Sequence, residues 1–403
     1  MADAPADRPD VSARPSRERP APLVLVVEPS EVAATAVPGS YAAVAATGQA
    51  LLAAELSQRL GSLGAAVEPL RPSRAQPDEP FHWGSWFARA ARAALAEAEG
   101  RVDAIGYAGA GALALLDDDA LDQLLSPLPG EVVANNRFSA DAFVVAMGEP
   151  GEAAAEEAAE AALSALAGCP TDNAAPRALE AAGFAIRDVA GAPFSRFDVD
   201  TPLDLALLRL ATRLGGTRSI DDRLRGFMEM AVVPGGGGLE VPGLAELGAV
   251  VRDRHAELVV AGRIPASTWR HLETETACRV RAFVEERGMR SARGGRPRSL
   301  LARWLEEHGP TSLVAELASL GDAVVLDSRV LMASLAGSAE ADAWPPEEDR
   351  FASDFGDAAR VRTPWLAELT AAATDASVPV LFGGHALVSD GLRVIVAAAW
   401  QGH

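Results

Sequence analysis

Apolar residues in the first half of the chain occur in short runs that alternate with stretches of helical spacing. Residues 22–29 form the first run, which is bounded by prolines and predicts a buried parallel strand. A helical pattern follows over 48–64, with apolar side chains three and four residues apart and a glycine at its end. The alternation continues to residue 214 and predicts a doubly wound α/β sheet.

This alternation stops at 217–242, a segment that contains four consecutive glycines at 235–238. Consecutive glycines predict a flexible hinge. Strand and helix patterns resume beyond it, including an expected strand over 322–334 and an expected long loop over 344–357. The pattern therefore predicts one α/β domain at 22–216 and a second, Rossmann-like domain at 243–403.

Length and the N-terminal residues narrow the class of protein. A chain of 403 residues is longer than one hydrophobic core usually supports and suits two domains. Residues 1–21 combine Pro, Ala, Asp and Arg without an apolar stretch, which predicts a disordered leader and no signal peptide. No apolar run reaches the roughly 18–20 uncharged residues that a membrane span needs, so we expect no membrane partner.

Charge and residue usage exclude several kinds of chemistry. The net charge of −20 argues against a nucleic-acid partner, because affinity for phosphate backbones comes mainly from clustered cations. Cys169 and Cys278 are the only cysteines and stand far apart, which favours a reducing, cytoplasmic location and no zinc site. All 36 basic residues are arginine, so a P-loop lysine and a Schiff-base lysine are excluded.

Three motifs follow one another in the first half, at 48–65, 103–125 and 197–208. In this order they resemble the nucleotidyltransferases of the glycosyltransferase-A (GT-A) type, such as the molybdenum-cofactor guanylyltransferases, over 23–214. The resemblance implies a nucleotidyltransferase-like sheet domain that binds a nucleotide or a phosphorylated small molecule. It also implies Mg²⁺ as the cofactor of nucleotidyl transfer, for which Asp198 and Asp200 of "FDVDTPLDLALL" are the candidate catalytic and metal-binding residues.

The chain departs from that family in two places. Residues 26–41 lack the family's paired glycines and cation, and 108–111 read Ala-Gly-Ala-Gly where the family has a metal-binding acid. A turn of this kind offers backbone N–H groups to an anion but no carboxylate to a metal. An alternative is therefore a non-catalytic binding or regulatory protein built on an enzyme-like fold.

The pair Asp198 and Asp200 has two interpretations. Residues two apart on a strand point to the same face, so on an apparent strand the two carboxylates would share one ion. Alternatively, Thr201 or Asp200 caps a helix that starts at Pro202, with Asp204 near its positive end. The two roles are compatible.

A second polar stretch follows the expected strand that ends near Ala134. Its candidate ligand-binding residues are Asn135, Asn136, Arg137 and Asp141, placed where open α/β sheets bind their ligands. Arg137 would hold a phosphate in place of the missing lysine. The alternative is an ordinary turn, because consecutive asparagines tolerate left-handed backbone conformations.

Polar residues in the second half are also concentrated at strand ends. The expected substrate-binding residues of this half are Arg263 after a strand, Asp327 and Arg329 within an apolar strand, and Arg350 in the long loop. His385 follows a strand and two glycines and is the candidate general acid or base. The same residues would also suit structural ion pairs, and a third hypothesis places an unrelated enzyme activity in this half around His385.

Overall fold

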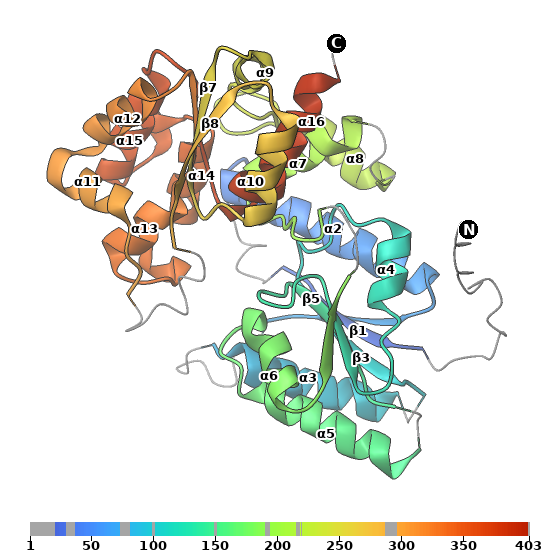
Figure 1. Cartoon of the computed structure of the whole chain (residues 1–403). Coiled ribbons are helices and arrows are strands. Elements are labelled where there is room, and N and C mark those ends of the chain that lie inside the picture. The colour runs from blue at the N-terminus through green and yellow to red at the C-terminus, as the bar shows by residue number, and fades with distance from the viewer. Residues whose placement is uncertain are drawn as a thin grey trace, which may run out of the picture.

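The structure is a computed structural model that describes residues 21–29, 37–72, 81–98, 101–148, 151–189, 194–214, 218, 220–286 and 296–401. The predicted leader at 1–21 lies almost entirely outside these residues, as do 30–36 of the stretch at 26–41. Figure 1 shows two sheets, one in each half of the chain, with helices α2 and α7 between them. The predicted α/β class is confirmed.

The first sheet is mixed and has the strand order β2-β1-β3-β5-β4-β6. Strand β5 runs antiparallel to both of its neighbours, whereas the remaining pairs are parallel. Its strands are β1 (Leu23–Val27), β2 (Ala66–Leu70), β3 (Ala104–Ala108), β4 (Glu131–Ala134), β5 (Ala142–Ala146) and β6 (Ala185–Asp188). The helices of this half are α2 (Tyr41–Ser62), α3 (Trp83–Glu97), α4 (Asp118–Leu124), α5 (Ala153–Ala167), α6 (Ala175–Ala181), α7 (Pro202–Arg213) and α8 (Asp222–Met230).

The second sheet is fully parallel, with the order β10-β9-β7-β8. Its strands are β7 (Glu257–Gly262), β8 (Arg279–Val284), β9 (Ala323–Asp327) and β10 (Val380–Gly383). The helices are α9 (Leu244–Arg252), α10 (Ala266–Glu275), α11 (Leu300–His308), α12 (Pro310–Ser319), α13 (Arg329–Ala336), α14 (Glu347–Asp354), α15 (Pro364–Thr374) and α16 (Leu392–Trp400), with a π-helical turn η5 (Leu387–Gly391) before the last.

Three local predictions are wrong. The expected strand over 322–334 ends at Asp327, and helix α13 begins at Arg329. Helix α13 is buried over its first residues, and a continuous apolar run does not distinguish a buried helix from a buried strand. The expected loop over 344–357 contains helix α14, and residues 197–200 are irregular rather than a strand.

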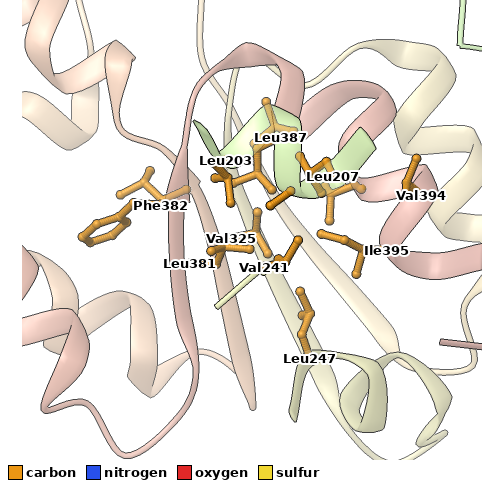
Figure 2. Close-up of a cluster of buried hydrophobic side chains, with 14 of the residues drawn as sticks. Leu203, Leu207, Val241, Leu247, Val325, Leu381, Phe382, Leu387, Val394 and Ile395 are labelled. Atoms are coloured by element: carbon orange, nitrogen blue, oxygen red, sulfur yellow. The ribbon is translucent and has the colours of Figure 1, made fainter. Parts of the chain in front are cut away.

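Helix α7 belongs to the first half in sequence but packs into the core of the second half. Leu203 and Leu207 lie beside Leu387, Val394 and Ile395 (Figure 2) in one hydrophobic cluster that extends from α2 to the second sheet. All five side chains are buried. The second sheet therefore shares one core with α2 and α7, whereas the buried strand residues of the first sheet belong to two other clusters.

The glycine-rich segment is flanked by residues of the same core. Val233, Leu239 and Val241 are buried in it, and a bridge pairs Val232 with Gly238. The boundaries 22–216, 217–242 and 243–403 stay predictions. In the part of the chain that the structure describes, no helix has the length and apolar character that crossing a membrane requires.

Candidate functional site

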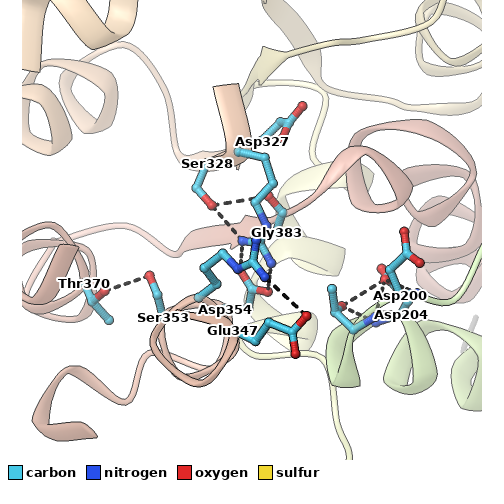
Figure 3. A network of polar contacts seen from close by, with 12 residues as sticks. Asp200, Asp204, Asp327, Ser328, Glu347, Ser353, Asp354, Thr370 and Gly383 are labelled. Carbon is cyan, nitrogen blue, oxygen red and sulfur yellow. Dashed lines mark hydrogen bonds and ion pairs between the residues drawn. The ribbon is translucent and has the colours of Figure 1, made fainter. Parts of the chain in front are cut away.

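The carboxyl ends of the two sheets face each other at the first turn of α7. A Cβ atom added to Gly383, the last residue of β10, would lie 2.9 Å from Cδ2 of Leu203 in α7. Figure 3 shows Asp200 and Asp204 on one side of this contact and Asp327, Asp354 and Glu347 on the other. Residues that are far apart in the sequence therefore form one polar region, which we call the inter-sheet site.

Aspartates from three segments form the first-half wall of this site. Asp141 precedes β5, Asp172 precedes α6, and Asp198 and Asp200 precede α7. Burial, followed by the charge of Asp172, raises the pKa of Asp141 to about 7. Burial, followed by the charges of Asp200 and Asp141, raises the pKa of Asp198 well above its ordinary value. The carboxyl groups therefore destabilise one another's ionised forms.

The backbone that carries Asp198 is fixed by a close approach to the turn after β3. Val199 donates its N–H to the carbonyl of Gly111 at 3.1 Å, and a Cβ on Gly111 would lie 2.2 Å from the Val199 carbonyl oxygen. Only glycine fits at this position. The N–H of Gly109 donates to the Asp141 carbonyl oxygen at 2.9 Å, so this turn holds the two aspartate segments together instead of presenting that N–H to an anion.

Asn135 and Asn136 are buried and bind the backbone. The Asn135 Oδ1 atom accepts from the N–H groups of Asp141 and Ala142, and its Nδ2 donates to the Ser195 carbonyl at 3.0 Å. Asn136 Oδ1 accepts from the N–H of Phe138, two residues ahead. The asparagine turn, which was the alternative to a ligand-binding role for this stretch, is therefore present. Asn135 also holds the backbone of Asp141 in place.

Arg137 pairs with a carboxylate outside the inter-sheet site. Its guanidinium lies 3.1 Å from Glu180 of α6 and over the ring of Phe138. The backbone N–H of Arg137 donates to Asp188 Oδ1. The role of Arg137 in holding phosphate stays a prediction, and in this conformation its charge is already matched.

The first turn of α7 is a capping box. Thr201 Oγ1 accepts from the N–H of Asp204, and Asp204 Oδ2 accepts from the N–H groups of Asp200 and Thr201. The cap is therefore Thr201 and not Asp200. Burial, followed by the charge of Asp200, raises the pKa of Asp204 to about 7, and its Oδ1 is buried with no partner among the described residues.

The donor chemistry of this wall suits Mg²⁺, which prefers hard oxygen ligands. Its geometry limits the number of protein ligands, because among the described residues no group of three or more His, Cys, Asp or Glu side chains is placed to hold a metal ion. A magnesium ion here would take one or two carboxylates, with Asp198 and Asp200 as the candidates, and would complete its shell with oxygens of water and of a ligand.

The second-half wall begins with an ion pair between neighbouring strand ends. Arg263, directly after β7, contacts Asp327 at the end of β9 with Nε–Oδ2 and Nη2–Oδ1 distances of 2.6 and 3.0 Å. Burial acts to raise the pKa of Asp327, but the Arg263 guanidinium outweighs it and holds the pKa below its ordinary value. A Cβ on Gly262 would lie 2.3 Å from the Asp327 Cβ, so this approach requires glycine.

His385 is half-buried and starts the helical turn that follows β10. It is one of the neighbours that lower the pKa of the buried Asp327, after Arg263. The sequence placed Arg263 and His385 after separate strands and Asp327 within a third. The structure brings them together where the strand order changes direction, the usual ligand position of an open α/β sheet.

Two further arginines differ in how completely they are paired. Arg329 makes a bidentate contact with Asp354, with both N–O distances at 2.6 Å. Arg350 is 7% exposed, its closest carboxylate is Glu347 at 3.5 Å, and its Nε has no partner among the described residues. Burial, followed by the neighbouring charge of Arg329, lowers the pKa of Arg350.

The charge of Asp200, across the inter-sheet site, acts to raise the pKa of Arg350, so the charges of the two walls interact. Asp354, the partner of Arg329, was predicted to lie in the loop over 344–357 and was not among the predicted site residues. Its signal in the sequence is the four-residue spacing from Arg350, which puts both on one face of α14.

No protein-family model, curated protein or solved structure matches this chain.

Proposed function

We propose that the protein binds a nucleotide or another phosphorylated small molecule in the inter-sheet site. The observation that carries the proposal is the pairing of an acidic wall, in which aspartates raise one another's pKa, with the incompletely paired Arg350 opposite. A phosphorylated ligand with a bound cation satisfies both walls, because the cation neutralises the carboxylates and the phosphate accepts from the guanidinium.

In this proposal Asp198 and Asp200 hold Mg²⁺, and Arg350 orients a phosphate. The ion, when bound, would neutralise phosphate charge. Asn135 and Gly111 act indirectly, since they fix the backbone of Asp141 and Asp198. Nucleotidyl transfer is the reaction that this arrangement would favour, because phosphoryl chemistry depends mainly on positioning and charge neutralisation.

A second candidate is non-catalytic binding on an enzyme-like fold. It is favoured by the turn at 109–111, whose glycines pack against the segments of Asp141 and Val199. The two candidates differ in their dependence on metal. Transfer requires binding that depends on Mg²⁺, whereas a binding protein would retain its ligand without it.

Thermal unfolding with nucleoside triphosphates and sugar phosphates, with and without Mg²⁺, tests the proposal. A ligand at 100 times its Kd stabilises the folded state by about 2.7 kcal/mol, which raises the Tm by several degrees. We expect one ligand class to give this shift only with Mg²⁺, and we expect Asp198→Asn combined with Asp200→Asn to abolish it.

Two arginine variants sharpen this test. Arg350→Gln removes the guanidinium of the inter-sheet site, and we expect it to reduce the shift. Arg92→Gln is the matched control, because Arg92 of α3 is paired with Glu160 of α5 and is not part of the inter-sheet site, and we expect it to leave the shift unchanged. A shift independent of Mg²⁺ would support the binding protein, and no shift with any ligand would refute both candidates.

A further inference from the structure

A separate cavity of about 480 Å³ lies between the C-terminal ends of α10 and α16. Figure 1 shows the two helices side by side in the second half. Helix α10 connects two parallel strands, and both helices start beyond carboxyl strand ends, so their C-terminal ends lie at the opposite edge of the second sheet. The cavity is therefore distinct from the inter-sheet site.

One side of the cavity is apolar and contains an aromatic ring. Val396, Ala397 and Trp400 of α16 line it. The indole N–H of Trp400 donates to the Glu275 carbonyl at 2.8 Å, which fixes the ring, yet 43% of the residue remains exposed. A ring held in this way offers an open face for stacking and for cation–π contact.

The other side is polar, and one buried atom of its lining lacks a partner. His271 lines the cavity, and its Nε2 is buried with no hydrogen-bond partner among the described residues. One turn earlier on α10, the Thr268 hydroxyl is in the same state. Buried polar atoms normally have partners, because each unpaired one costs about 1–3 kcal/mol. This side is therefore suited to a ligand with a polar head group.

The charged residues around the polar side determine which charge the ligand's head group should carry. Arg393, Glu275 and Asp390 all act on His271, and Arg393 is paired with Asp390 at 3.0 Å. Burial, followed by the charge of Arg393, lowers the pKa of His271, so its imidazole is uncharged at neutral pH. Two carboxylates then face one guanidinium, and the excess negative charge of Glu275 favours a cation.

We propose that this cavity binds a small aromatic amine, whose ring stacks on Trp400 and whose ammonium group lies beside the Glu275 carboxylate on the polar side of the cavity. The carboxylate forms an ion pair with the ammonium. The cavity is large enough for a single ring with a short side chain. An anionic ligand is disfavoured, because its head group would approach Glu275.

Isothermal titration calorimetry on the full chain tests this site with three probes that share a phenylethyl group and differ in head group. We expect 2-phenylethylamine to bind, and we expect 2-phenylethanol and 3-phenylpropionate to bind at least about tenfold more weakly. Glu275→Gln and Trp400→Ala should each weaken binding of the amine about tenfold. Glu273→Gln is the control, because Glu273 is exposed on the same helix and is not part of the cavity lining.

Two results would overturn the proposal. One is the absence of saturable binding by the amine, and the other is equal affinity for the amine and the carboxylate probe. Because Trp400→Ala removes a hydrogen bond to α10, its folding is checked by thermal unfolding, while the surface variant Glu275→Gln keeps the test decisive. Asp198→Asn combined with Asp200→Asn should leave amine binding unchanged, which separates this site from the inter-sheet site.

Discussion

Asp204 has two opposing roles at the start of α7. As part of the capping box it accepts hydrogen bonds from the backbone of Asp200 and Thr201, which stabilises its ionised form. Burial and the charge of Asp200 act more strongly and raise its pKa to about 7. In the unfolded chain an aspartate has a pKa of about 3.9. The folded protein therefore binds a proton at Asp204 that the unfolded chain has already released.

This difference gives stability a defined dependence on pH. Between about pH 4 and pH 7 the folded state holds more protons at Asp204 than the unfolded state, so the free energy of unfolding falls as the pH rises. We expect Asp204→Asn to make this fall less steep, because asparagine carries no charge and its Oδ1 still accepts hydrogen bonds. Urea unfolding across this range measures the effect. Asp119→Asn, at an exposed site in α4, controls for the lost charge, and identical slopes in parent and Asp204→Asn would contradict the prediction.

At the scale of elements, α2 depends on a residue from the other half of the chain. The N–H groups of Tyr41 and Ala42 donate to the two carboxylate oxygens of Glu348 in α14, at 3.1 and 3.0 Å. Ser40 accepts from the third N–H of the helix. A carboxylate at this position satisfies free N–H groups and interacts favourably with the helix dipole.

We expect Glu348→Ala to lower the free energy of unfolding by about 1–2 kcal/mol, because two buried or half-buried N–H groups lose their partner. Urea unfolding at neutral pH measures this change. Glu316→Ala, at an exposed position on α12, is the matched control and should change stability by less than about 0.5 kcal/mol. A cost for Glu348→Ala no larger than that of the control would show that Glu348 does not cap α2.

How well the elements could be predicted from sequence depended on local pattern. Strands such as β1 and β7 are apolar runs with clear boundaries, and Thr201-Pro202 predicted the start of α7 correctly. Helix α13 was missed because its apolar residues continue those of β9, and α14 because its charged residues resemble a solvent-exposed loop. Asp349 and Asp354 of α14 are buried and accept hydrogen bonds from Thr363 and Arg329, partners outside the helix that local sequence does not show.

At the scale of the molecule, the inter-sheet site arises from the way the two sheets are joined. The sequence identified most of its residues, including Asp198, Asp200, Arg350 and His385, but it gave no information on whether the two groups meet. They meet because α7 places its first turn against the end of β10 while its apolar face enters the second core. Long-range packing of this kind is set by complementary shapes, not by local pattern.

This arrangement predicts that both halves unfold together, in contrast to two domains on a flexible hinge. Leu207 in α7 is fully buried, and a Cβ on Gly391 would lie 2.8 Å from its Cδ1. We expect Leu207→Ala to lower the free energy of unfolding by about 2–5 kcal/mol and to shift a single transition. Leu179→Ala, in a cluster made only of first-half residues, should shift the same transition.

Urea unfolding followed by hydrogen exchange in β1, β3, β7 and β9 distinguishes the two cases. Exchange from β7 and β9 that Leu207→Ala accelerates and Leu179→Ala leaves unchanged would instead indicate two independent units.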